Sequence, residues 1–225
     1  MFRRIFLTAL IAGVVAGLFI AALQRIKIVP LIEQAEVYEA AETHAEHGGM
    51  TVPGVWQPEG GVERAAYTIM ADVLTGIGFG LVLTGVIALA GQRGHVVDAR
   101  LGLVWGAAGF AVFVLAPALG LPPSLPGMAG AELAQRQAWW IGTAAATAMG
   151  LGLIVFRPML VYRMIGVGLL ILPHAIGAPD PPEHGGSVPP ELAARFVIAS
   201  IFAAALFWLV LGGTSGWLYR RLDRA

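Results

Sequence analysis

The sequence contains no cysteine, a single lysine and few charged residues of any kind. The absence of cysteine excludes disulfides, thiolate metal ligands and thiol catalysis, and it leaves the redox compartment open. Charged residues make up 12% of the chain, against roughly 25% in soluble domains. The basic residues, Lys27 and the arginines, form no cluster large enough to hold a nucleic acid, so we expect no such partner.

Long apolar runs take the place of the missing charge, with 57% hydrophobic residues in the chain. A helix needs about 20 apolar residues to cross roughly 30 Å of hydrocarbon, and a soluble core needs no runs of that length. The sequence therefore predicts an all-α polytopic membrane helix bundle, one membrane domain over residues 1–225 embedded in the lipid bilayer. About six transmembrane helices are expected, at about 5–29, 65–90, 101–119, 138–156, 159–178 and 194–218.

The first predicted span is interpreted as a retained membrane anchor. Its apolar stretch runs unbroken to Leu23, whereas the apolar region of a signal peptide has about 7–15 residues. A cleaved signal peptide is the alternative, but no small-x-small cleavage site follows. The fifth predicted span is short, and Tyr162-Arg163 interrupts its inner end.

Arginine placement predicts the orientation of the chain in the membrane. With a cytoplasmic N-terminus, nine basic residues fall inside and five outside, whereas eleven of the fourteen acidic residues fall outside. Only an even number of spans puts both Arg3-Arg4 and Arg220-Arg221 in the cytoplasm. We therefore predict six spans with cytoplasmic N and C termini, in a multi-pass protein of the cell (inner) membrane. The loops and flanks that are then outside contain Arg64, Arg136 and Arg195.

Glycines spaced four apart recur in the predicted spans. Such pairs let helix backbones approach closely in lipid, where no hydrophobic force gathers helices. We expect them to serve close packing within one bundle rather than a dedicated dimer face. The pairs are Gly13/Gly17, Gly76/Gly80, Gly102/Gly106 and Gly212/Gly216.

The first outer loop, residues 30–64, is acidic and contains two histidines. Pro30 followed by regularly spaced glutamates predicts an acidic helix that continues beyond the membrane. His44 and His47 would share one face of this helix, and His184 in the last outer loop has acidic neighbours. Imidazole with carboxylate suits divalent cobalt, nickel, zinc or copper, so these histidines are candidate metal ligands. Because the spacing is not diagnostic, an acidic loop that simply contains histidines is the alternative.

Asp72 lies about two turns inside the second predicted span. A charged carboxylate there costs roughly 2.5–3.5 kcal/mol on insertion, so such residues tend to be functional or paired. His174 lies at a comparable depth in the fifth span, where Pro173 frees a backbone carbonyl. We predict that Asp72 faces the bundle interior and forms a polar step with His174 on a cation route. The alternative is a structural Asp72, protonated or bonded to Thr68 or Thr75.

Several motifs are missing. No GxxxxGK[ST] run occurs, so the chain contains no nucleotide-driven motor, and no HExxH run marks a metalloprotease. No histidine and nucleophile stand in a pattern typical of intramembrane hydrolysis. His95 and His174 are predicted near opposite faces of the membrane, which excludes a bis-histidine haem. The sequence thus indicates a protein that is not an enzyme and binds no nucleotide, with no cofactor firmly implied.

Five segments of the sequence resemble the CbtA family, whose members are predicted cobalt transporter subunits. They are MFRRIFLTALIAGVVAGL, PLIEQAEVYE, GLPPSLPGM, AQRQAWWIGTAAATA and LPHAIGAPDPPEHGGSVPPELAARF, in order along nearly the whole chain. GLPPSLPGM and PHAIGAP are the most specific of these marks. The resemblance implies cobalt uptake for cobalamin synthesis, with a small single-helix partner, CbtB, that carries a histidine-rich end. The family is described with five spans, whereas this sequence indicates six.

Two functions of different classes follow. The first is a membrane subunit of a divalent transition-metal (cobalt) uptake transporter, in which the acidic outer face concentrates cations above the intramembrane carboxylate. Its cargo would be transient divalent cobalt, or nickel or zinc, which the types of ligand do not distinguish. The alternative is a non-transporting accessory or scaffold subunit of a larger membrane complex. A scaffold has no need of Asp72 or of the outer histidines.

Overall fold

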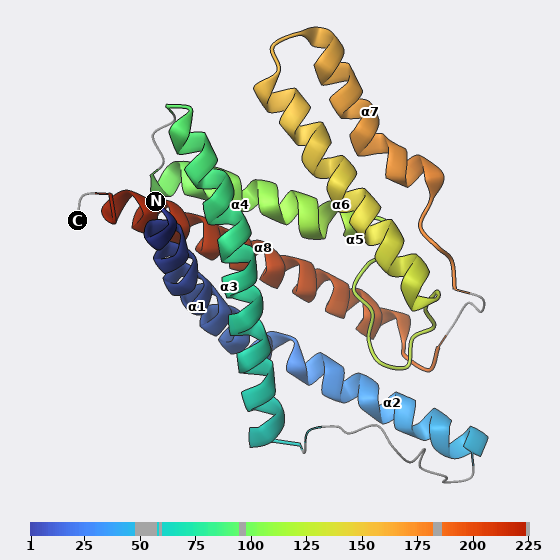
Figure 1. The fold of residues 1–225 in the computed structure, drawn as a ribbon. Coiled ribbons are helices and arrows are strands. Elements are labelled where there is room, and N and C mark those ends of the chain that lie inside the picture. The colour runs from blue at the N-terminus through green and yellow to red at the C-terminus, as the bar shows by residue number, and fades with distance from the viewer. Residues whose placement is uncertain (48–57, 59, 95–97, 182–185, 224–225) are drawn as a thin grey trace. The chain divides into compact units, whose positions relative to one another are not determined.

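The computed structural model describes residues 1–47, 58, 60–94, 98–181 and 186–223, without the side chains of residues 41–47. These residues form helices joined by loops, with no strand among them beyond one isolated bridge between Met128 and Gly186. The helices, drawn in Figure 1, are α1 (Phe2–Lys27), α2 (Val29–His47), α3 (Val62–Gln92), α4 (Ala99–Phe110), the π-helical turn η1 (Ala111–Leu115), α5 (Ala116–Ala118), α6 (Leu133–Phe156), α7 (Leu160–Ile176) and α8 (Pro190–Arg221). The predicted all-α fold is confirmed.

Every predicted span corresponds to a helical segment. Among the described residues, five segments are long and apolar enough to cross a membrane: α1, α3, the continuous helix Ala99–Ala118, α6 and α8. Helix α7, the predicted fifth span, has 17 residues and a length of about 25 Å, slightly less than the roughly 30 Å of hydrocarbon. The bundle therefore has five long apolar helices and a shorter one, as expected for a polytopic membrane protein.

Helix ends differ from the predicted span ends, because hydropathy marks only the apolar part of a helix. Helix α6 begins at Leu133, although its predicted span begins at 138, so its first turns are polar. The first predicted span reaches Val29, but α1 ends at Lys27 and α2 starts at Val29. Helix α2 then continues to His47, which confirms the acidic helix predicted after Pro30.

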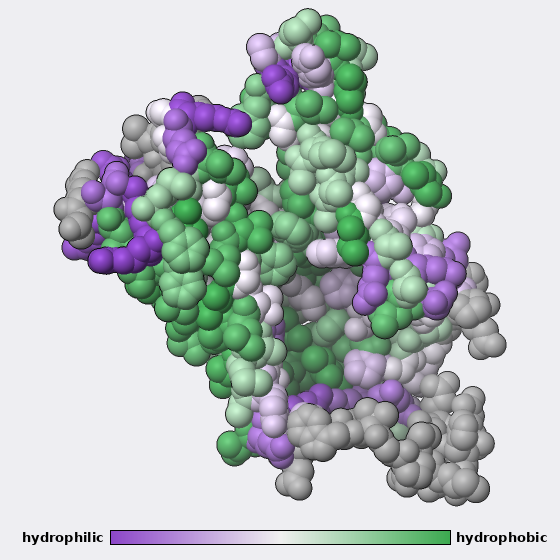
Figure 2. All heavy atoms as spheres, in the orientation of Figure 1, coloured by the Kyte–Doolittle hydropathy of each residue, from purple (hydrophilic) through white to green (hydrophobic). Residues whose placement is uncertain are grey.

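The surface of the helices is apolar. Large hydrophobic side chains are strongly exposed at many positions, including Leu74 (60%), Met164 (68%) and Ile198 (70%). Figure 2 shows hydrophobic residues over much of the visible surface and hydrophilic residues in separate patches. Contiguous apolar surface of this extent is rare on soluble monomers and is the surface that a lipid environment favours.

The chain divides into two compact units. Unit 1 contains Met1–Pro30, Thr43–Gly109 and Phe202–Ala225. Unit 2 contains Leu31–Glu42 and Phe110–Ile201, so α8 contributes residues to both.

Glycine pairs hold the helices of unit 1 together. A Cβ atom added to Gly13 would lie 2.5 Å from Ile77 Cα, and one added to Gly17 would lie 2.5 Å from Val73 Cα. The second helix pair uses the same device, since Gly102 and Gly106 on α4 abut Gly212 on α8. All four predicted pairs thus pack within the chain, which confirms their expected role.

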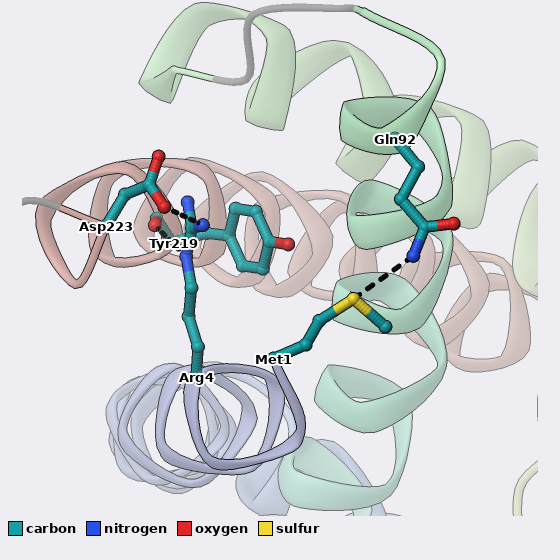
Figure 3. Close-up of polar contacts among 5 residues, drawn as sticks. All are labelled: Met1, Arg4, Gln92, Tyr219 and Asp223. Carbon is teal, nitrogen blue, oxygen red and sulfur yellow. Dashed lines mark hydrogen bonds and ion pairs between the residues drawn. The ribbon is translucent and has the colours of Figure 1, made fainter.

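The two termini of the chain meet at one end of unit 1. Arg4 Nε donates a hydrogen bond of 2.6 Å to Tyr219 O, its guanidinium lies 3.6 Å from the centre of the Tyr219 ring, and Nη1 pairs with Asp223. Gln92 Nε2 at the end of α3 donates to Met1 Sδ at 3.1 Å (Figure 3). Both termini therefore lie on the same side of the membrane, as an even number of spans requires.

Asp98 joins this end of unit 1 to the start of α4. Its Oδ1 accepts a hydrogen bond of 3.0 Å from the Leu101 N–H, which caps the helix, and Oδ2 lies 3.9 Å from Arg220 Nη1. The Leu101 N–H, assisted by Arg100 and Arg220, holds the pKa of Asp98 below its usual value of 3.8. Asp98 precedes the membrane-spanning helix, so it titrates in water.

The Asp98 cap gives a prediction about acid stability. Because the pKa is lowered in the folded state, the carboxylate stabilises the fold at pH values above its ordinary value of 3.8. That contribution is lost as the pH falls through the lower folded value. Melting temperatures of wild type and Asp98→Asn, measured against pH in one detergent, should differ near neutrality and converge in acid. A difference that is independent of pH would contradict this account of Asp98.

Unit 2 is built on the hairpin of α6 and α7. Gly150 on α6 and Gly166 on α7 face each other, since a Cβ added to either glycine would lie 2.7 Å from the carbonyl oxygen of the other. Pro173 lies inside α7, as the sequence indicated, and Gly177 ends the helix at a φ of 89°. Few L-residues adopt this backbone conformation, which explains the glycine.

Candidate functional site

Asp72 lies at the packed interface of α3 and α1. Its Oδ1 accepts a hydrogen bond of 3.3 Å from Gln24 Nε2 on α1, and its Oδ2 is buried without a partner among the described residues. Gly17 brings the two backbones together beside it, since a Cβ there would lie 2.8 Å from the Asp72 carbonyl oxygen. The side chain therefore points toward a neighbouring helix of its own unit, and its hydrogen-bond partner is neither Thr68 nor Thr75.

Gln24 is not among the site residues predicted from the sequence, although the sequence contains a signal for it. Gln24 follows Gly17 by seven residues, so both lie on one face of α1. Asp72 precedes Gly76 by four residues and shares a face of α3 with it. Since the glycine faces pack together, the two polar side chains had to lie on the same interface. A long side chain also points back toward its helix N-terminus, which carries the Gln24 amide toward Gly17 and Asp72.

His174 lies in unit 2, half-buried near the end of α7. Its ring meets the Trp139 ring of α6 edge to face, with centroids 6.0 Å apart. Trp139 also fills the space beside Gly120, since a Cβ added to Gly120 would contact the indole ring. The indole Nε1 of Trp139 is buried without a partner among the described residues. His174 is thus held in an aromatic contact. Asp72 belongs to unit 1, so the step between Asp72 and His174 stays a prediction.

Segments far apart in the sequence converge on one loop of unit 2, residues 120–131. An added Cβ at Gly120 would lie 3.0 Å from Ala178 Cβ. One at Gly127 would lie 2.9 Å from Ser187 Oγ and 3.3 Å from Glu39 Cβ of α2, and Met128 bridges to Gly186. We call these joined segments, residues 31–40, 120–131, 177–181 and 186–189, the loop cluster.

The remaining histidines cannot be placed at the site. His44 and His47 lie in α2, but their side chains are outside the description, and His184 lies outside the described residues. Among the side chains that are described, no three histidine, aspartate or glutamate residues come together in a way that could hold a metal ion. The predicted metal-ligand set of His44, His47, Asp72, His174 and His184 therefore stays a prediction.

The loop cluster contains residues from the same segments that carry the resemblance noted in the sequence: PLIEQAEVYE, GLPPSLPGM, PHAIGAP and, in the last segment, GSVP (residues 186–189). The family model described as "probable cobalt transporter subunit (CbtA)" matches residues 2–220, nearly the whole chain. The chain belongs to the CbtA family. No curated protein and no solved structure matches it.

Membership of the CbtA family and the apolar helices together make this chain a multi-pass membrane protein of a transporter-subunit family. Within this CbtA protein, unit 1 holds the intramembrane carboxylate and unit 2 holds the loop cluster. A lone carboxylate that accepts one hydrogen bond can still offer an oxygen to a cation. The loop cluster joins part of α2 to three loop segments of unit 2.

Proposed function

We propose that this CbtA protein is the membrane subunit of a divalent transition-metal uptake transporter, with cobalt as its cargo. The family match over residues 2–220 supports the cobalt cargo. The main support for placing this chain on the cation route comes from Asp72. This residue lies inside a membrane-spanning helix, and its Oδ2 lacks a partner among the described residues. The protein acts by moving an ion and carries out no covalent chemistry.

The contact between Asp72 and Gln24 suits a transient cation site. Gln24 Nε2 holds one carboxylate oxygen at 3.3 Å, and the other oxygen, which is buried, has no partner among the described residues and is the one we propose for the ion. An ionised carboxylate attracts a divalent cation, but a single carboxylate holds it weakly compared with a full shell of ligands. Conduction requires this balance, since an ion must bind well enough to enter and weakly enough to leave.

The acidic helix α2 lies on the proposed outer side and would raise the local concentration of cations. A small single-helix partner of the CbtB type would add histidine ligands there, and His44, His47 and His184 would act with it. Imidazole binds metal in its neutral form, so this capture should fade below its ordinary pKa of about 6.5. The cell (inner) membrane is the proposed location.

Cobalt accumulation in cells tests the proposed function. Three conditions would be compared in a bacterium that lacks its own cobalt uptake. The chain would be expressed alone, the chain would be expressed together with its small partner, and the partner would be expressed alone. We expect the pair to raise cell-associated cobalt several-fold over the empty vector at low external metal, and the partner alone to leave it unchanged. No rise with the pair, at a confirmed level of membrane insertion, would contradict a transport role and favour the scaffold alternative.

A further inference from the structure

A groove of about 720 Å³ lies within unit 2, outside the candidate cation site. It is bounded by the end of the helix Ala99–Ala118, by residues 121–124 and by the first two turns of α6. Its volume falls within the range of about 300–1,000 Å³ that is typical of ligand pockets. The side chains that matter for its chemistry are Phe113, Pro117, Leu121, Arg136, Trp140 and Ile141.

The helix beside the groove is irregular where it lines the groove, at Phe113, Val114 and Pro117. In η1 the Ala116 N–H bonds to Ala111 O, five residues back, which widens the helix by one residue at this turn. Pro117 follows and has no N–H to continue the regular pattern. Phe113 of this turn packs on Trp140 of α6 with ring centroids 6.1 Å apart and forms an aromatic wall.

Arg136 is the one charged residue that lines the groove. Its guanidinium lies over the loop, with Nη1 3.2 Å from the position of a Cβ on Gly130. No carboxylate pairs with it in the part of the chain that the structure describes. This unpaired positive charge repels a divalent cation, so the groove is not part of a metal route, and it attracts an anion instead.

The groove runs from polar to apolar along α6, from Arg136 to Trp140 and Ile141. Arg136 precedes the apolar stretch that begins at about residue 138, which places it at the level of the lipid headgroups. Trp140 and Ile141 lie about one turn deeper, and Phe113 and Pro117 belong to the neighbouring membrane-spanning helix. The polar end and the apolar end are thus arranged like the headgroup and the acyl chain of a lipid.

We propose that this groove binds an anionic phospholipid. Its phosphate is held by the Arg136 guanidinium, whose planar donors match phosphate oxygens in a bidentate contact. Its acyl chain lies along Phe113, Trp140 and Ile141. A partner helix fits less well, because the groove spans only about two turns of α6 whereas a membrane helix presents roughly 30 Å of length.

Lipid titration of the purified full chain tests this proposal. Native mass spectrometry would measure binding of phosphatidylglycerol and phosphatidylcholine to delipidated protein. We expect about tenfold tighter binding of phosphatidylglycerol to wild type, and loss of that preference in Arg136→Gln, because charge-assisted contacts of this kind are among the stronger hydrogen bonds. Arg195→Gln is the matched control, since Arg195 is also an outer arginine but does not line the groove, and it should keep the preference.

Two further measurements distinguish other occupants of the groove. Arg136→Lys retains the charge and should keep part of the preference, which separates charge loss from misfolding. Excess inorganic phosphate should fail to displace phosphatidylglycerol, since the acyl chain contributes to binding. The proposal would be overturned if Arg136→Gln kept the lipid preference, or if inorganic phosphate alone displaced the lipid fully. It would also be overturned if Arg136→Gln lost a co-purifying protein and not a lipid.

Discussion

Replacement of Gly76 by alanine is expected to disrupt unit 1, whereas replacement of Gly78 is expected to be harmless. A Cβ on Gly76 would run into Gly13 O, and its next contacts are Gly13 C at 3.2 Å and Gly17 N at 3.3 Å. All three are backbone atoms, which cannot swing aside as the end of a side chain can. The substitution therefore forces α1 and α3 apart along their whole contact.

The cost of this separation is large because close backbone approach drives helix association in lipid. Forcing an extra carbon into a close-packed interface costs about 1–3 kcal/mol. Gly78 is the matched control on the same helix, with nothing within 4 Å of an added Cβ. Alanine there should be neutral or slightly stabilising, since alanine favours a helix by about 0.8–1 kcal/mol over glycine in water. Unfolding by a denaturing detergent would measure both, and equal midpoints would contradict the packing described for α1 and α3.

Asp72→Asn is expected to abolish most metal uptake while leaving the fold intact. The asparagine keeps the shape and a hydrogen-bonding oxygen for Gln24, but it removes the charge that attracts the cation. Two unit charges 4 Å apart attract by about 4 kcal/mol at an effective dielectric constant of 20, and the attraction is greater for a divalent ion. Since 1.4 kcal/mol is a factor of ten in binding, uptake should fall at least about tenfold.

Stability should change little in the same variant. Hydrogen bonds between membrane helices contribute about 0.6 kcal/mol on average, and removal of a buried charge offsets part of that loss. An uptake defect with an unchanged melting temperature therefore separates a transport role from a structural one. Glu132→Gln is the matched control, because it makes the same carboxylate-to-amide change at an exposed residue before α6. If Asp72 is structural, Asp72→Asn should retain uptake.

The features that depend on local pattern could be predicted from the sequence. The length of the apolar runs predicted the membrane-spanning helices. The spacing of the glycines predicted which faces of α1, α3, α4 and α8 pack against a neighbouring helix. Charge bias and an even number of spans predicted that the termini share one side, and the contacts of Arg4 with Tyr219 and Asp223 agree with this. Each of these signals is carried by residues within one or two turns of each other or by a net count of charges.

Features that depend on the register between helices could not be predicted in the same way. The contact of Gln24 with Asp72 requires α1 and α3 to be antiparallel neighbours with Gly17 opposite Val73, and hydropathy does not identify neighbours. The π-helical turn Ala111–Leu115 was missed because it preserves the apolar character of its span. Convergence of α2 with the loops of unit 2 was also invisible, since turns rich in proline and glycine have no periodicity to read.

The initial rate of cobalt entry into vesicles reconstituted with purified protein tests the central claim most directly. Vesicles that contain equal amounts of wild type, Asp72→Asn or Glu132→Gln, each with the small partner present, would be compared with vesicles that contain the partner alone. The account predicts equal rates for wild type and Glu132→Gln, and a rate for Asp72→Asn close to that of the partner alone. Equal rates for all three chains, or no entry above the partner-alone rate with wild type, would contradict it.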